Sequence, residues 1–183
     1  DILSLAPHKF YGLNGSGLLI KRRNVELYPL IQGGASVTAY RSGTPTLALG
    51  AALETALRLA LAHSAEWTGI VEKHNLALRR ALSAYPEVIV NSPDDAVPHI
   101  LNLSVKGVKG TVFQRALNEF GVCVSVKSAC STDGQPSKAV LAVCHDSRNA
   151  LSSWRISLSH LTTDEEIGEF IKIFDRCYQK LVK

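Results

Sequence analysis

A long helical pattern across residues 46–84 constrains the fold of this chain more than any other segment. Apolar residues recur there at the three- and four-residue spacing of an amphipathic helix, and any bend is expected near Gly69. Its apolar first part, residues 47–62, is interrupted by Glu54 and Arg58, which predicts a packed helix and not a membrane span. A helix of this length is typical of a connection between two domains.

Shorter segments on both sides of this helix alternate between strand and helix patterns. Residues 2–6 and 17–20 flank a glycine-rich turn and predict two strands, and residues 25–31 are a weaker candidate that Pro29 interrupts. Further strands are expected at residues 88–91, 99–105, 122–126 and 153–158, and helices at residues 111–120 and 136–143.

The last expected helix starts at a capping box, in which Thr163 is followed three residues later by Glu166. The alternation of strands and helices predicts an α/β fold. We place one domain in residues 1–64 and the other in residues 65–183, with the long helix at the boundary.

The composition is that of a soluble globular chain, with 46% hydrophobic and 20% charged residues. The net charge of +4 is small, and the basic run at residues 21–23 is typical of a solvated turn, so neither nucleic acid nor membrane is an expected partner. No leader and no zinc-type cysteine spacing is present, which favours a cytoplasmic protein without a structural metal. Because the sequence contains no methionine, we expect it to be part of a longer protein.

Lys9 is the first candidate for chemistry. It ends an apolar segment through Pro7 and His8 and precedes a glycine-rich turn. A desolvated lysine at such a place can hold an aldehyde cofactor as a Schiff base. Most lysines that follow a strand are solvated turn residues, so the position alone leaves both interpretations open.

Cys130 differs in its surroundings from the other three cysteines. It lies in the polar, glycine-containing segment 127–135, where a thiol would be exposed. Cys123, Cys144 and Cys177 lie among apolar neighbours, which predicts that they are buried.

Two further residues suggest anion binding. Thr44 precedes Pro45 and is expected to be the N-cap of the long helix, with Pro45 at its first position. Such a helix start offers free N–H groups to an anion, although the residues alone favour an ordinary cap. Arg155 lies in an otherwise apolar strand and needs an anionic partner, either a ligand or an acidic side chain of the protein.

Five motifs occur in an order that resembles one enzyme family. They are Pro7-His8-Lys9-Phe10-Tyr11-Gly12, Gln32-Gly33-Gly34, Tyr40-Arg41-Ser42-Gly43-Thr44-Pro45, Ser128-Ala129-Cys130-Ser131 and Trp154-Arg155-Ile156-Ser157-Leu158-Ser159. This ordered set resembles the C-terminal part of the pyridoxal-phosphate-dependent cysteine desulfurases, in the class V aminotransferase group of fold type I. The resemblance implies that residues 1–64 end the large cofactor-binding domain. It also implies that residues 65–183 form a linking helix and a small C-terminal α/β domain that carries the cysteine loop.

The resemblance implies a role for each candidate residue. Lys9 would hold pyridoxal phosphate as a Schiff base and then move protons, and His8 would line the cofactor pocket unless it is only a turn residue. Thr44 would reach the cofactor phosphate of a partner subunit, which implies a homodimer. Arg155 would bind the α-carboxylate of L-cysteine. Cys130 would accept sulfur as a persulfide, leave L-alanine as co-product and pass the sulfur to an acceptor or scaffold protein.

Several alternatives stay open at this stage. The parent protein could be a selenocysteine lyase or another class V aminotransferase relative, although a plain aminotransferase has no use for Cys130. This part alone could instead be a non-catalytic module that binds a sulfur-acceptor protein. The pathway, whether iron–sulfur cluster assembly, tRNA thiolation or cofactor sulfuration, is equally open. The residues that stack on the cofactor ring belong to the family's N-terminal part and cannot be named in this chain.

Overall fold

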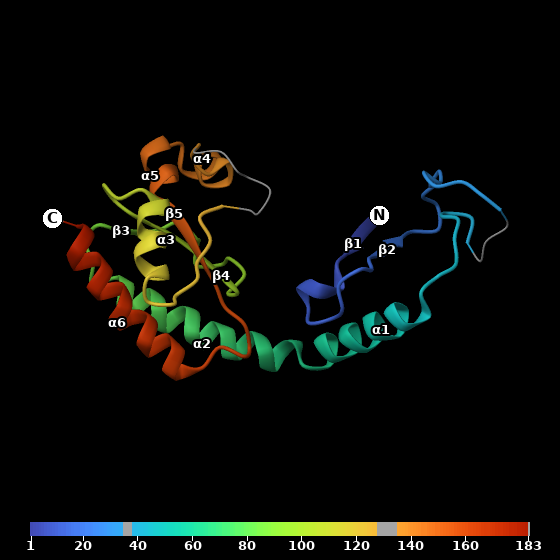
Figure 1. Cartoon of the computed structure of the whole chain (residues 1–183), viewed down its shortest axis with the longest axis horizontal. Coiled ribbons are helices and arrows are strands. Elements are labelled where there is room, and N and C mark those ends of the chain that lie inside the picture. Colours follow the sequence, from blue (N-terminus) through green and yellow to red (C-terminus); the bar gives the residue numbers. More distant parts are fainter. Residues whose placement is uncertain (35–37, 128–134, 183) are drawn as a thin grey trace. The chain divides into compact units, whose positions relative to one another are not determined.

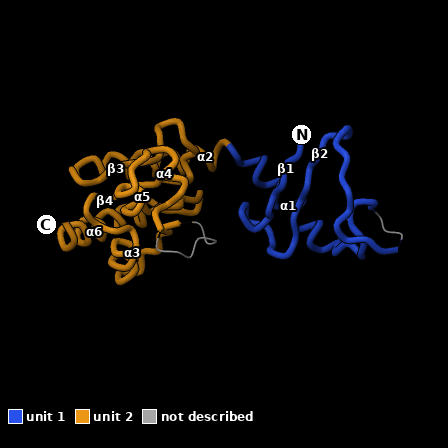
Figure 2. The backbone as a smooth tube through the Cα atoms, turned by 90° about the horizontal axis from the view of Figure 1, so that it is seen from above, with its two compact units in different colours: residues 1–64 blue, residues 65–183 orange. Residues whose placement is uncertain are grey.

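The chain divides into two compact units, residues 1–64 and residues 65–183 (Figure 2). The structure is a computed structural model that describes residues 1–34, 38–127 and 135–182. Both units mix helices and strands, so the α/β prediction is confirmed. The division falls at the residue where the sequence places it, while the assignment of each unit to a large or a small domain stays a prediction.

The predicted long helix is two helices, α1 (Leu47–Ala62) and α2 (Ser64–Leu82). The break lies at His63, whose backbone angles of −106° and 6° leave the helical region, and not at Gly69, which lies inside α2. The Ser64 hydroxyl donates a hydrogen bond to the Leu61 carbonyl oxygen at 3.3 Å. Serine side chains compete in this way for backbone groups, and this competition is the local reason for a break that apolar periodicity cannot detect.

Unit 1 contains a two-stranded antiparallel sheet that packs beside α1 (Figure 1). Strand β1 (Ile2–Leu5) pairs with β2 (Leu18–Lys21), and the 3-10 helix η1 (Pro7–Lys9) follows β1 directly. A Cβ atom at Gly12 would lie 2.8 Å from the Pro7 Cβ and 3.1 Å from the Ala56 Cβ. Glycine therefore lets the turn after η1 lie close against α1.

Two expectations for unit 1 are wrong. Residues 25–31 form no strand, because Pro29 cannot donate a ladder hydrogen bond and no described segment pairs with them. The apolar segment before Lys9 was expected to desolvate the lysine, but Ile2 and Leu3 are each 53% exposed and Lys9 itself is exposed. In the described part of this unit β1 pairs only with β2, so its apolar side chains remain accessible.

Unit 2 is built on an antiparallel sheet in the order β3–β4–β5. Its strands are β3 (Val88–Val90), β4 (Ile100–Val105) and β5 (Ser153–Ser157). Residues 122–126 were expected to form another strand, but they contribute only one isolated bridge, between Ser125 and Arg155. Side chains alternate across the sheet, so Leu101 and Leu103 lie in the core whereas Asn102 lies on the opposite face.

The core of unit 2 lies between this sheet and three helices, α2, α3 (Gly110–Asn118) and α6 (Asp164–Leu181). Its centre is aromatic. The ring centroid of Phe113 lies 5.3 Å from that of Trp154 and 5.2 Å from that of Phe174. Helix α6 begins at the predicted capping box, in which the Thr163 hydroxyl accepts from the Glu166 N–H at 3.2 Å. None of the helices in the described part of the chain is long and apolar enough to cross a membrane.

Two short helices, α4 (Lys138–Cys144) and α5 (Ser147–Ser152), lie on the other side of the sheet (Figure 1). Helix α5 was not expected from the sequence, because six residues are too few to show a helical period. The sequence feature that marks the start of α5 is its N-cap, Asp146. The Asp146 side chain accepts hydrogen bonds from the backbone N–H groups of Arg148 and Asn149 at 2.8 and 3.2 Å.

The burial of the cysteines corrects the expectation made from their neighbours. Cys177 is buried in the core, and this burial raises the pKa of its thiol. Cys123 is exposed and Cys144 is half-buried. Cys123 lies outside the helices and Cys144 ends the short helix α4, and in either setting adjacent side chains point in different directions, so apolar neighbours do not report the burial of the cysteine itself.

Gly110 provides a direct test of the packing between α3 and β5. A Cβ atom at this position would collide with the Ser153 carbonyl oxygen, which is backbone and cannot turn away. We expect Gly110→Ala to lower the free energy of unfolding by about 2 kcal/mol. Gly168 in α6 is the matched control, because no described atom beyond its chain neighbours and its own helix backbone lies within 4 Å of an added Cβ. Gly168→Ala should raise the free energy of unfolding by about 0.5–1 kcal/mol. Urea denaturation of both variants measures the difference, and equal stabilities would contradict the packing.

Candidate active site

Lys9 lies at the end of η1, which holds it on a defined turn of unit 1. The Lys9 N–H donates to the Ala6 carbonyl oxygen at 3.0 Å, and the Phe10 N–H donates to the Pro7 carbonyl oxygen at 3.0 Å. The next residue, Tyr11, has a φ of 67°, in the left-handed region that non-glycine residues rarely adopt. Strain of this kind costs about 1–3 kcal/mol and gathers at functional sites.

The side chains of His8 and Lys9 are exposed, and neither forms a hydrogen bond or ion pair with any residue that the structure describes. The buried Pro7 anchors the turn while the ammonium group next to it remains available. This turn therefore holds the backbone of Lys9 in place and leaves its amine free for a ligand, as a residue that binds a carbonyl compound requires.

Thr44 is exposed and is not the N-cap of α1, which corrects the prediction. The N-cap is Thr46, with backbone angles of −84° and 95°, and helix α1 starts at Leu47. Two threonines flank Pro45, and the preference of proline for the first helical position favoured the wrong one. Gly43, with a φ of 110°, makes the turn that precedes this segment. His8, Lys9 and Thr44 all belong to unit 1, although no described hydrogen bond joins them.

Arg155 lies on β5 and is held from both sides. It stands opposite Asn102 of β4, and its backbone N–H donates to the Ser125 carbonyl oxygen at 2.7 Å. The structural ion pair considered for Arg155 is not observed with any described acidic residue. Its Nε atom is buried and has no hydrogen-bond partner among the described residues. A buried guanidinium N–H needs an acceptor, and an anionic ligand can supply one.

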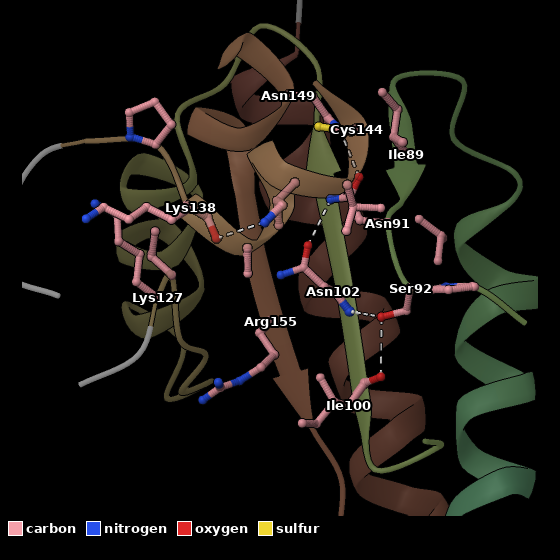
Figure 3. Close-up of a pocket in the computed structure, with 18 residues that line it drawn as sticks. Ile89, Asn91, Ser92, Ile100, Asn102, Lys127, Lys138, Cys144, Asn149 and Arg155 are labelled. Atoms are coloured by element: carbon pink, nitrogen blue, oxygen red, sulfur yellow. Dashed lines mark hydrogen bonds between the residues drawn. The ribbon is translucent and has the colours of Figure 1, made fainter. Parts of the chain in front are cut away.

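Arg155 lines a pocket of about 990 Å³ on the polar face of the sheet in unit 2 (Figure 3). Its cationic lining residues are Arg155, Lys127 and Lys138, and no acidic residue is among the described residues that line it. Its remaining wall is largely apolar along α4 and also contains three side-chain amides, those of Asn91, Asn102 and Asn149. The charge of this pocket favours a small molecule that carries a negative group.

Cys130 lies outside the described residues. Lys127 and Pro136, which stand on either side of it in the sequence, both line the pocket of Arg155. Lys9 and Arg155 belong to different units.

The sequence interpretation missed a chain of hydrogen-bonded amides in this pocket. Asn91, Asn102 and Asn149 come from three separate segments and form consecutive hydrogen bonds of 2.9 Å. The available sequence signal was the alternation of Asn102 and Ser104 with leucines along β4, which predicts a strand with one polar face.

A model of the aminotransferase class-V family matches residues 1–170, and the chain belongs to that family. It is 33% identical over 186 residues to the "NifS/IcsS protein homolog" of Lactobacillus delbrueckii subsp. bulgaricus, covering 100% of this chain and 48% of that protein. It is 32% identical over 187 residues to the cysteine desulfurase IscS of Dictyoglomus turgidum, covering 99% of this chain and 47% of that protein.

Solved structures agree with these relatives. A NifS-like protein superposes with a TM-score of 0.88 at 27% identity, covering 99% of this chain and 47% of the other. The NifS-like protein of Rickettsia africae superposes with a TM-score of 0.85 at 27% identity, covering 98% of this chain and 48% of the other. The chain thus spans about half the length of the proteins it matches. The expected family and fold are confirmed.

Proposed function

We propose that the protein to which this chain belongs is a pyridoxal-phosphate-dependent cysteine desulfurase. The observation that carries this proposal is the buried Arg155 Nε, which has no partner among the described residues and lies in a pocket that no described acidic residue lines. A guanidinium fork matches the two oxygens of an α-carboxylate. Relatives that match the whole chain bear the name cysteine desulfurase, and that name supports L-cysteine as the source of this carboxylate.

The exposed, unpaired amine of Lys9 fits a cofactor with an aldehyde group. We assign to Lys9 the covalent attachment of pyridoxal phosphate and the transfer of protons at its Nζ atom, and to His8 a place beside the cofactor. When bound, this cofactor supplies a sink for the electrons of the substrate. Thr44 would contribute a hydroxyl to its phosphate.

We assign the sulfur transfer to Cys130. Its thiolate attacks the sulfur of the substrate, and a new S–S bond forms while the carbon–sulfur bond breaks. The electron pair of the broken bond stays with the β-carbon of the substrate. This carbon takes up a proton, and the product is released as L-alanine. Cys130 keeps the transferred sulfur as a persulfide, and an acceptor or scaffold protein, such as one in iron–sulfur cluster assembly, then removes it. We place this reaction in the cytoplasm.

The test is to incubate the full-length protein with pyridoxal phosphate, L-cysteine and a thiol reductant. We expect L-alanine and sulfide in equal amounts. Release of alanine from L-selenocysteine but not from L-cysteine would instead identify a selenocysteine lyase. Failure to act on either substrate would contradict the enzymatic proposal and favour a binding module.

Thr44 tests a homodimeric assembly with shared sites. If Thr44 serves the cofactor of the neighbouring subunit, mixed dimers of Lys9→Ala and Thr44→Val protomers contain one intact site. Random reassembly of two nearly inactive variants should then restore about a quarter of the wild-type activity. Alanine release after co-refolding of the two full-length variants measures this recovery, and two Lys9→Ala protomers are the control. Activity that stays at the level of the separate variants would contradict shared sites.

A further inference from the structure

The pocket of unit 2 contains a directed chain of amide hydrogen bonds that ends beside Arg155 (Figure 3). Asn149 Nδ2 donates to Asn91 Oδ1 at 2.9 Å. Asn91 Nδ2 in turn donates to Asn102 Oδ1 at 2.9 Å and to Ser104 Oγ at 2.8 Å. Both hydrogens and the carbonyl oxygen of the Asn91 amide are therefore used.

This chain fixes which way the Asn102 amide faces. The Ser104 hydroxyl donates its hydrogen to the backbone carbonyl oxygen of Asn149 at 3.0 Å, so towards Asn91 it can only accept. Asn91 must therefore present its donors to Ser104 and Asn102, and Asn102 must present its oxygen to Asn91. The donor group of Asn102, its Nδ2, then points away from Asn91, and no described residue accepts a hydrogen bond from it.

The Asn102 backbone is held as firmly as its side chain. Its N–H donates to Ser92 Oγ at 2.9 Å, and its carbonyl oxygen accepts from the Asn91 N–H at 2.8 Å. Asn102 lies directly opposite Arg155 in the β4–β5 register, and both side chains line the pocket. Side chains paired in this way have Cβ atoms about 4.5–5.5 Å apart, which is close enough to share one small ligand.

We propose that Asn102 is a second donor to the α-carboxylate that Arg155 binds, and that Asn91 and Asn149 are positioning residues that aim its amide. This inference rests on the proposed function and adds a residue that recognises the substrate. A carboxylate has about four acceptor sites, and one guanidinium fork occupies only two of them. A neutral amide supplies a further donor without adding charge to a pocket that already contains three cationic side chains.

Asn102→Asp separates this role from a purely structural one. The substitution keeps an oxygen that accepts from Asn91, so the amide chain is preserved. It replaces the outward Nδ2 donor with a second oxygen, which repels a carboxylate. Asn91→Asp makes the complementary change, because the new carboxylate cannot donate and Asn102 must turn its own donors towards it and away from the pocket.

The experiment measures binding of L-alanine and of ethylamine, which lacks the carboxylate, to the full-length protein with its cofactor by calorimetry. We expect each of the two variants to weaken L-alanine binding at least ~10-fold and to leave ethylamine binding unchanged. Asn118→Asp is the control, since Asn118 is exposed on α3 and does not line the pocket, and both ligands should bind as in the wild type. Unchanged L-alanine binding, or an equal loss for both ligands, would overturn the proposal.

The outcome also separates this inference from the proposed function, because alanine binding requires no sulfur chemistry. Asn102-dependent binding of L-alanine by a protein that releases no alanine from L-cysteine would refute the desulfurase and keep the carboxylate site. Alanine release from L-cysteine, together with wild-type binding of L-alanine by the Asn102→Asp variant, would support the desulfurase and refute the role of Asn102.

Discussion

Replacing Lys9 by alanine in the full-length protein is expected to lower alanine release from L-cysteine by at least ~10³-fold, because a covalent attachment point and a proton donor are lost together. The fold should remain intact, since the exposed Lys9 side chain forms no hydrogen bond or ion pair with the described residues. Borohydride reduction of the wild-type protein with its cofactor, followed by peptide mapping, identifies the attached lysine.

The matched control is Lys21→Ala, which removes another lysine of unit 1 at the end of β2. This variant should retain its activity and its labelled peptide. Labelling of a lysine other than Lys9, or turnover that survives Lys9→Ala, would exclude the assignment.

Cys130→Ser is expected to abolish persulfide formation and to reduce sulfide release ~10²-fold or more, since serine is a far weaker nucleophile towards sulfur than a thiolate. Binding of L-cysteine should persist because Lys9 and Arg155 are unchanged. The polar sequence around Cys130 predicts a change in unfolding free energy of only about 0.5 kcal/mol.

Cys123→Ser and Cys144→Ser are controls for this result. Cys123 is exposed, and Cys144 lines the pocket of Arg155, so both thiols are open to chemical modification in the described structure. Cys123→Ser should release sulfide at the wild-type rate, and Cys144→Ser should still form the persulfide on Cys130. A Cys130→Ser protein with full activity would remove the nucleophile assignment and favour a lyase or an aminotransferase.

Local signals allowed much of the fold to be predicted. The capping box at Thr163, the polar and apolar alternation along β4, and the apolar period of α1 each depend on a few neighbouring residues. The predictions failed where a competing contact decides the outcome. The helix breaks at His63 through a side-chain hydrogen bond of Ser64, and residues 122–126 form one bridge to β5 but no strand with any described segment.

The candidate site likewise contains residues that could be predicted from the sequence and features that could not. Arg155 could be selected from sequence because an arginine within an apolar strand needs an anionic partner, and Lys9 because it belongs to the ordered set of motifs that resembles the family. The orientation of Asn102 could not be inferred, since it depends on Asn91 and Asn149, which only the folded chain brings together. The cap at Thr46 was missed because the sequence offered two threonines for the same task.

Peptide mapping of the full-length protein after brief exposure to L-cysteine tests the central claim most directly. The desulfurase proposal predicts that the peptide containing Cys130 gains the mass of one sulfur atom, in step with the L-alanine formed. Peptides that contain Cys123, Cys144 or Cys177 should keep their mass. Alanine formation without added sulfur at Cys130, or added sulfur on the pocket residue Cys144 instead, would contradict the account.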